Sequence, residues 1–429
     1  MEKIESDISM KKVEDARLPS CCRDPFAVIF AVALVLYTIL TMPSLSQPLL
    51  DQHAFRQCQT AISAEWLATD LNPLRMPYYE TPVFGAPWRV PFEFPIFQWL
   101  AAVLHVVSGM AIGTACRTVS VVMHLACLFP LWRLAEPVAE MMNSAKPAAT
   151  VRRRLFWVVG SLFLLSPILL YWSRTSLIES TALYFGLEYL AAQMRWTRTG
   201  AWPSFVAAVF FSAAACLVKI TTFPPFAAAA MLDTIFAVMR RQPQRLAGRV
   251  LGWRLVASVV PLAVGYCAIA SWVSFADGQK MLNPLAAGTT SAALHRWNYG
   301  TWQQRCSGEL WIDTVLLRGV PEAIGWIGPF IFLCGVAVAR PATRGIALAC
   351  GVLFLIPFLM FTNLHIRHNY YQYAVASWLL MAVAVVVTEA SQRFSQRLIA
   401  VLLIASLCGG GVMYARYYLP WQFASFRND

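Results

Sequence analysis

The sequence predicts an all-α polytopic membrane protein with about eleven transmembrane helices. Of its 429 residues, 58% are hydrophobic and 13% are charged, and the mean hydropathy is +0.56. A soluble protein carries roughly 25% charged residues, so a single soluble domain is excluded. Uncharged runs recur at about the 20 residues that a helix needs to cross a bilayer. In a membrane protein, basic residues indicate above all which loops face the cytoplasm. We interpret the net charge of +12 in this way and expect no nucleic-acid partner.

The elements begin with a basic amino-terminal segment. Residues 1–25 hold Lys and Arg but no apolar run, which predicts a cytoplasmic tail and not a cleaved leader. The first span is predicted at Phe26–Ser44. Ten later crossings complete the set. One of them is either Phe94–Cys116 or Thr118–Trp132. The other nine are Leu155–Trp172, Ser180–Met194, Trp202–Val218, Ile220–Met239, Leu255–Phe275, Ala323–Ala339, Gly345–Leu364, Tyr370–Thr388 and Leu398–Tyr414.

Arg117 creates an ambiguity, because it divides two apolar runs, 94–116 and 118–132, that make either two crossings or one. With one crossing, all the basic loops lie on the cytoplasmic side, as the positive-inside rule for short loops requires. We therefore predict eleven crossings, a cytoplasmic amino terminus and an outer carboxyl terminus. The segment from Phe94 to Gly113 is then expected to lie along the outer interface or to re-enter.

This topology defines the predicted domain organisation. The membrane body covers residues 26–420, and residues 421–429 form an outer tail. Two long loops, 45–117 and 276–322, lie on the outer side and are rich in Trp, Tyr and Pro. We expect the function to reside in these loops.

The first candidate cluster follows the first span directly. Asp51, His53, Arg56 and Gln57 bring a carboxylate, an imidazole, a guanidinium and an amide to the membrane surface. Asp51 is a plausible helix N-cap, which would be a structural role. The functional interpretation is that Asp51 accepts a proton from a hydroxyl nucleophile while Arg56 neutralises an anion, because a general base must face its substrate and not a salt bridge.

A second carboxylate, Glu179, lies with Arg174 at the predicted outer end of a later span. The alternative explanation is that Glu179 merely favours the positive end of a helix dipole. Lys219 ends another span at the same face, just before Pro224 and Pro225. For Lys219 the alternative is a side chain that extends to the interface without further function.

Two aromatic segments complete the outer candidates. Residues 363–373 carry His365, His368 and Tyr371 beside Arg367, a set of donors suited to phosphate oxygens. Residues 78–95 carry Glu80 and Glu93 among aromatic residues, where the two carboxylates could orient sugar hydroxyls or the segment could simply be an interfacial aromatic belt.

Other titratable groups give weaker signals. Glu188 and Asp233 fall inside apolar runs, where charged residues are functional candidates by default, although each could pair with a cation nearby. Cys58 and Cys306 are the cysteines of the outer loops, and a disulfide between them is a hypothesis. The sequence has no Cys and His spacing typical of zinc.

The motifs resemble bacterial GT-C glycosyltransferases, a group akin to protein O-mannosyltransferases and lipid A aminoarabinose transferases. The resemblance covers about residues 26–390 and is carried by Asp-x-His-x-x-Arg-Gln at 51–57, Glu-Thr-Pro-Val-x-Gly-x-Pro-Trp at 80–88, Pro-Phe-Glu-Phe-Pro at 91–95, Ser-Arg-Thr with Ile-Glu-Ser at 173–180, Val-Lys-Ile-Thr at 218–221 and His-Asn-Tyr-Tyr at 368–371. It implies a multi-helix membrane body, interfacial helices in the first outer loop, and a polyprenyl-phosphate sugar donor used at the outer face.

The resemblance also implies roles for individual residues. Asp51 and Glu179 match catalytic acids, while Lys219, His365 and His368 would contact the donor phosphate. Here Gln52 and Asn369 stand where related sequences often have acids. No cofactor is therefore expected, and a divalent cation stays an open alternative.

We therefore expect an inverting glycosyltransferase of a bacterial inner membrane with its active site on the periplasmic side. It would move a hexose or pentose from a polyprenyl phosphate to a hydroxyl of an envelope lipid, glycan or protein. In this hypothesis Arg56, Lys219, His365, His368 and Tyr371 hold phosphate, and His53, Gln57, Glu80, Glu93 and Arg174 bind substrate. The alternatives are a flippase of lipid-linked sugars and a structural subunit of an assembly complex.

Overall fold

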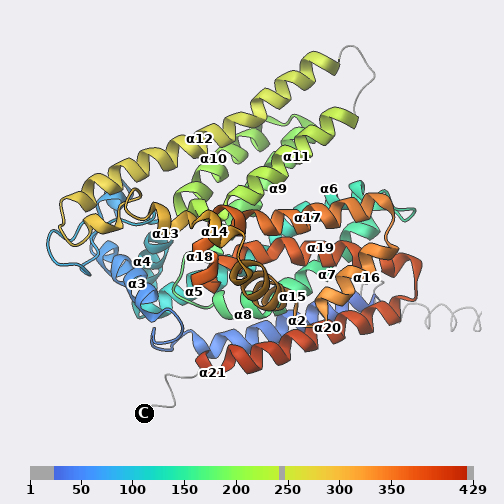
Figure 1. Cartoon of the computed structure of the whole chain (residues 1–429), viewed down its shortest axis with the longest axis horizontal. Helices are drawn as coiled ribbons and strands as arrows, with labels where there is room; N and C mark the ends of the chain where they lie inside the picture. Colours follow the sequence, from blue (N-terminus) through green and yellow to red (C-terminus); the bar gives the residue numbers. More distant parts are fainter. Residues whose placement is uncertain (1–23, 241–246, 423–429) are drawn as a thin grey trace, which may run out of the picture.

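The computed structural model describes residues 24–240 and 247–422, and these residues form helices and loops without any strand. The predicted tails, 1–25 and 421–429, lie almost wholly outside these ranges. Long helices run roughly parallel to the long axis of the molecule, and the shorter helices of the first long loop gather at one end of it (Figure 1). The prediction of an all-α membrane fold is confirmed.

Two groups of helices make up the body (Figure 1). In the first, α10 (Trp202–Lys219) packs between α9 (Glu179–Thr199) and α12 (Ala247–Met281), with α11 (Pro224–Arg240) alongside. In the second, α19 (Gln372–Arg393) contacts several neighbours and has its apolar window fully buried. Around α19 lie α7 (Ala148–Leu165), α8 (Pro167–Trp172), α15 (Val320–Ile324), α16 (Gly328–Val338), α17 (Pro341–Met360) and α20 (Gln396–Tyr417), and α2 (Pro25–Thr41) packs on α7 and α20.

Within the described residues, seven helices are long and apolar enough to cross a membrane, or eight if one bent pair counts as a span. The protein is therefore a multi-pass membrane protein. Each predicted span coincides with a helix or a helix pair, but α7, α9 and α11 do not reach this criterion. α7 contains three consecutive arginines from Arg152, and α9 carries two glutamates and two arginines. The count of eleven stays a prediction.

The two apolar runs on either side of Arg117 form helices of different length, as expected for one crossing, which stays a prediction. α5 (Ile112–Ala126) and α6 (Leu128–Met141) together form a candidate span of 30 residues. The preceding run forms only a 13-residue helix, α4 (Ile96–Ser108), which ends at Gly109 in a left-handed conformation. α4 packs on α3 (Ala54–Ala68), so the loop predicted at 45–117 contains two short helices, and its outer placement stays a prediction.

A sharp bend interrupts the predicted span 323–339. The helical segment Glu309–Ile324, which ends with α15, meets α16 at an angle of 88°. Gly325 at this bend has φ +69°, and a Cβ there would lie 2.8 Å from the backbone nitrogen of Gly410 in α20. The bend and the close approach of α20 therefore both require glycine at position 325.

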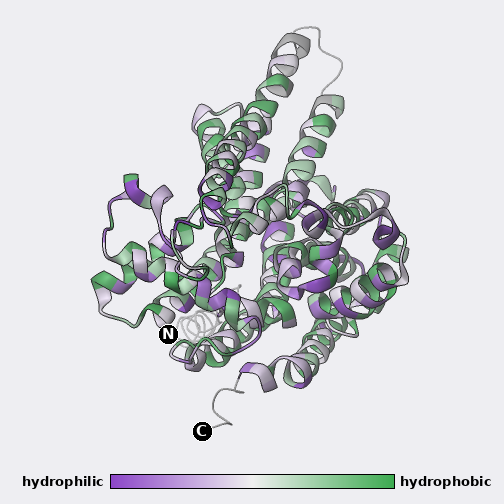
Figure 2. Ribbon diagram, turned by 60° about the vertical axis from the view of Figure 1, so that its left-hand side comes forward, coloured by the Kyte–Doolittle hydropathy of each residue, from purple (hydrophilic) through white to green (hydrophobic). Residues whose placement is uncertain are grey.

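The charges inside the apolar runs are paired. Arg133 Nη1 lies 2.5 Å from Glu188 Oε2, and Arg198 Nη2 lies 2.9 Å from Asp233 Oδ1. Long helices are mainly hydrophobic along their shafts, and polar residues are more frequent in the loops (Figure 2). Cys58 and Cys306 are free thiols, so the structure does not support a disulfide between them.

Candidate active site

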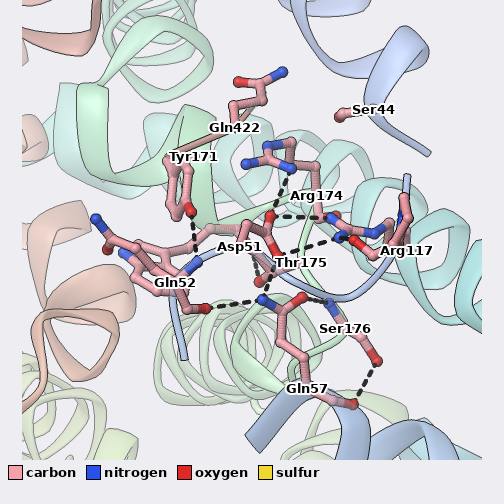
Figure 3. A network of polar contacts seen from close by, with 12 residues as sticks. Ser44, Asp51, Gln52, Gln57, Arg117, Tyr171, Arg174, Thr175, Ser176 and Gln422 are labelled. Atoms are coloured by element: carbon pink, nitrogen blue, oxygen red, sulfur yellow. Dashed lines mark hydrogen bonds and ion pairs between the residues drawn. The ribbon is translucent and has the colours of Figure 1, made fainter. Parts of the chain in front are cut away.

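The first part of the site is a buried ionic network around Asp51 (Figure 3). Asp51 lies in the loop between α2 and α3 and is 5% exposed. Its Oδ2 lies 2.9 Å from Arg174 Nη1, and its Oδ1 lies 3.2 Å from Arg117 Nη2. Gln57 Nε2 donates a 2.6 Å hydrogen bond to Oδ1. One carboxylate thus joins three segments that are distant in the sequence.

The network also fixes the backbone of the loop that follows α2. Arg117 donates to the carbonyl oxygens of Pro48 and Arg174, each at 3.0 Å. The amide oxygen of Gln57 accepts from the backbone N–H of Ser176 at 3.0 Å. Arg117 and Gln57 each bind both Asp51 and a backbone group of another segment. Asp51 and its partners therefore hold the start of α3 against the segment that leads into α9.

The charge state of Asp51 follows from these contacts. Burial alone would raise the pKa of this carboxyl, but the two guanidinium groups and the Gln57 amide outweigh burial and hold the pKa below its usual value. Asp51 is therefore ionised at neutral pH and faces cations. Its predicted role as a general base stays a prediction.

The second part of the site is a cavity of about 330 Å³ beside this network. It lies between the first outer loop, the end of α10, the end of α12 and the segment before α19. Charged or phenolic side chains from each of these segments reach it, namely Arg56, Glu93, Glu179, Lys219, Asp277, Lys280, Tyr370 and Tyr371. A cavity of this size is within the range of small-ligand sites.

Two ion pairs form the polar wall of the cavity. Arg56 Nη2 contacts both carboxylate oxygens of Glu93, at 2.6 and 2.7 Å. Burial would lower the pKa of Arg56, but Glu93 outweighs it and raises the pKa above its usual value. Lys219 pairs with Glu179, and its ammonium lies 3.8 Å from the centroid of the Tyr371 ring. Each of the two basic side chains is therefore held next to a carboxylate.

The local backbone explains how Lys219 and Glu179 meet. Glu179 is the first residue of α9, and Lys219 is the last residue of α10, which packs antiparallel against α9. Lys219 is followed by Pro224 and Pro225, so α10 cannot simply continue into α11. The two side chains thus arrive at the same end of the helix pair.

A cluster of rings connects the network to the cavity. His53 caps α3 in a left-handed conformation with φ 57°. Its ring centroid lies 5.0 Å from that of His368 and 4.9 Å from that of Tyr370. Burial lowers the pKa of His53, and burial together with nearby positive groups lowers that of His368 to about 4. Both imidazoles are neutral at pH 7, so they can offer an N–H donor but no charge.

The structure thus brings together most of the predicted residues, in layers. Arg56, Glu93, Glu179, Lys219 and Tyr371 line the cavity, whereas Asp51, Gln57 and Arg174 lie behind it. Two residues lie elsewhere. His365 is 1% exposed and packs 4.5 Å from the Phe358 ring, and Glu80 lies at a separate hollow.

Three charged residues were missed by sequence reasoning. Arg117 was treated only as a break between spans, although a lone arginine in an apolar stretch is itself a signal of function. Lys280 and Asp277 carry no motif, and only the length of α12 brings them to the cavity. In the described part of the chain, no group of three or more His, Cys, Asp or Glu side chains is arranged to hold a metal ion.

Comparisons with known proteins place this geometry in context. No family model and no curated protein sequence matches the chain. The structure is similar to the crystal structure of ArnT from Cupriavidus metallidurans bound to undecaprenyl phosphate, with a TM-score of 0.56 and 16% identity. The chain has the GT-C fold.

The likeness covers 88% of this chain and 62% of ArnT, so the chain corresponds to about three fifths of that protein. A crystal structure of the Archaeoglobus fulgidus oligosaccharyltransferase, in complex with zinc and sulfate, matches with a TM-score of 0.47 and 11% identity, covering 92% of this chain and 53% of the other. At 16% identity, the likeness to ArnT shows a shared fold and assigns no role to the residues of the site.

Proposed function

We propose that the chain is a membrane glycosyltransferase that moves a sugar from a polyprenyl phosphate to a hydroxyl group of an envelope acceptor. The proposal depends mainly on the composition of the cavity. Arg56, Lys219 and Lys280 line the same space as Glu93 and Glu179. Cations suit a phosphate, and carboxylates suit sugar and acceptor hydroxyls. The shared fold supports this proposal, because ArnT was crystallised with undecaprenyl phosphate.

In the proposed reaction the acceptor oxygen attacks the anomeric carbon while the bond from that carbon to the phosphate oxygen breaks. The acceptor proton passes to a carboxylate, and the polyprenyl phosphate leaves with an additional negative charge. Lys219 and Arg56 would stabilise that charge, which is the kind of electrostatic term that dominates many enzymatic rate enhancements. A single displacement inverts the anomeric configuration.

Glu179 is the carboxylate that we assign to the acceptor proton. It lines the cavity, and its only ionic partner in the described residues is Lys219. When the donor phosphate attracts Lys219, Glu179 becomes free to accept a proton. Asp51 lies one layer behind, so we propose that it positions Arg117, Arg174 and the loop that carries Arg56.

The experiment uses membranes that contain the full chain and radiolabelled polyprenyl-phosphate sugars. Transfer of label to the envelope fraction is expected with the wild type, and loss of transfer is expected with Glu179→Gln and with Lys219→Ala. Arg75→Ala is the matched control. Arg75 is an exposed cation of the same loop as Arg56, and it lines neither the cavity nor the separate hollow at Glu80. Unchanged transfer in both cavity variants would overturn the proposal.

The flippase alternative receives no support from the intramembrane acids. Glu188 and Asp233 are both paired with arginines, so they give no sign of a polar translocation path. Sealed vesicles separate the two activities: movement of the lipid-linked sugar without a new glycosidic bond would favour transport. The proposed setting is a bacterial inner membrane with the cavity on the periplasmic side, which cysteine labelling from each side of intact cells would test.

A further inference from the structure

We infer that a second hollow, next to the proposed active site, binds a saccharide portion of the acceptor. The hollow has a volume of about 470 Å³ and is lined by Glu80, Trp88, Arg89, Gln279 and Leu282 with the Ala86–Pro87 backbone. The assignment of this ligand to the acceptor rests on the proposed function. The binding itself is inferred from the side chains described below.

The loop that forms one wall is fixed in place. Asn283, which is 1% exposed, donates through Nδ2 to the carbonyl oxygens of Gly85 and Pro87, each at 3.0 Å. The backbone of Trp88 is held as well, because its carbonyl oxygen accepts from Thr81 N at 2.8 Å and from Val90 N at 2.9 Å. The hollow is therefore built by a rigid loop docked on the end of α12.

The side chains that face the hollow are available to a ligand. Trp88 is 47% exposed even though its backbone is held. Across the described ranges, the side chains of Glu80, Arg89 and Gln279 make neither an ion pair nor a hydrogen bond with another residue, and the Arg89 guanidinium lies 5.9 Å from the centroid of the Tyr78 ring. A carboxylate, a guanidinium and an amide thus line one space with an aromatic face and leave their hydrogen-bonding capacity unused.

This combination matches the chemistry of a pyranose ring. The ring has an apolar face of C–H groups that packs on an indole, and its rim of hydroxyl groups both donates and accepts hydrogen bonds. Glu80 can accept, whereas Arg89 and Gln279 can donate. A few placed polar groups around an aromatic surface are the usual pattern of small-molecule sites.

The hollow and the cavity lie beside the same helix. Ala276, Asp277 and Lys280 of α12 line the cavity, whereas Gln279 and Leu282 line the hollow, so the last turns of one helix separate the two spaces. We assign the hollow to acceptor residues that lie away from the hydroxyl that reacts.

The location favours a saccharide over lipid. α12 has 35 residues and is about 52 Å long at 1.5 Å per residue, which exceeds the roughly 30 Å of the hydrocarbon core. Its C-terminal end lies at one extremity of the long axis of the molecule (Figure 1). The charged residues Asp277 and Lys280 in its last turns line the polar cavity, so this end of the helix borders polar space.

The test is binding of the purified full-length protein, in detergent micelles, to an array of immobilised bacterial saccharides. The wild type is expected to bind at least one saccharide, and Trp88→Ala to weaken that binding about ten-fold, as for the loss of one aromatic contact. Glu80→Gln and Gln279→Ala are expected to weaken it as well. Trp302→Ala is the matched control, because Trp302 is 73% exposed and lines neither space.

Absence of any bound saccharide, or full binding by the Trp88→Ala, Glu80→Gln and Gln279→Ala variants, would overturn the inference. A second measurement uses nanodiscs with brominated lipids, in which the Trp88 fluorescence is the difference between wild type and Trp88→Phe. Quenching of this fluorescence would also overturn the inference, because it would place the indole in the membrane. The array requires no donor. Its outcome is therefore independent of whether the chain transfers sugar.

Discussion

Asp51 and Arg174 form an ion pair of 2.9 Å in which the arginine side chain is 0% exposed and the aspartate side chain 3%. Arg117, also 0% exposed, joins the same carboxylate from α5. Two buried guanidinium groups thus share one counter-charge. This arrangement explains why Asp51, although adjacent to the cavity, is better suited to hold the site together than to exchange protons with a substrate.

We expect Asp51→Asn to destabilise the protein, because it leaves Arg117 and Arg174 buried without a counter-charge. Removing one partner of a buried ion pair typically costs about 3–5 kcal/mol. The measurement is the midpoint of thermal unfolding in detergent, beside the transfer assay. Full loss of transfer with an unchanged midpoint would instead support the predicted role of Asp51 as the general base.

Lys280 allows a second test, because it lines the cavity although it belongs to no recognisable sequence motif. Its ammonium donates to the carbonyl oxygen of Thr289 at 3.1 Å and lies 5.1 Å from the Phe92 ring centroid. If it contacts the anionic donor, Lys280→Ala should raise the KM for the lipid-linked sugar about ten-fold, and Lys280→Arg should largely restore it.

The appropriate comparison is a titration of donor at a fixed acceptor concentration, with protein amount normalised by immunoblotting. An unchanged KM in Lys280→Ala would exclude Lys280 from donor binding. The Glu179 and Lys219 assignments would not be affected by that result.

The pH dependence of stability should report His365 together with His53 and His368, whose pKa values burial also lowers. Burial lowers the pKa of the His365 imidazole to about 3, so it is neutral in the folded protein, whereas in the unfolded chain it titrates near its ordinary value of about 6.5. Stability is then highest above pH 6.5 and falls as the pH drops from 6.5 toward 3, by roughly 1.4 kcal/mol per pH unit from His365 alone.

His365→Gln removes this titration. Its unfolding midpoint should decrease less than that of the wild type between pH 7 and pH 5, measured by differential scanning fluorimetry. The carboxyl of Asp51 contributes little in this window, because its lowered pKa means that its stabilisation is lost only at more acidic pH. Parallel curves for variant and wild type would show that His365 is not the group responsible.

Gly325 tests the bend between α15 and α16. Gly325→Ala combines an unfavourable positive φ with a Cβ 2.8 Å from the Gly410 nitrogen, so we expect a lower unfolding midpoint and weaker packing of α20. Gly345→Ala is the control. Gly345 lies inside α17, a Cβ there meets nothing within 4 Å, and alanine favours helix. Equal midpoints for both variants would contradict the steric explanation.

Much of the fold could be predicted from the sequence because apolar runs and loop charges act locally. Each predicted span matches a helix or helix pair, and the choice to make the 94–113 segment a non-crossing one agrees with the 13-residue α4. The bend at Gly325 was missed, because a glycine within an apolar run does not by itself reveal the neighbour that approaches it.

The candidate site was predictable only in part. Arg56, Glu179 and Lys219 stand out because charged residues next to spans are rare in so apolar a chain, and all three reach the cavity. Their partners were not predictable. Glu93 pairs with Arg56 across 37 positions and Lys219 with Glu179 across 40, distances at which no local spacing rule applies.

The sequence by itself determined that the chain enters a membrane, where its helices lie and which ionisable residues flank them, since the hydrophobic effect and helix geometry act over about 20 residues. Only the tertiary structure decided that Asp51 is enclosed by Arg117 and Arg174, that Glu80 and Glu93 face different spaces, and that Lys280 joins the cavity. Those outcomes depend on how helices distant in the chain pack together, and packing sets burial and charge pairing for each side chain.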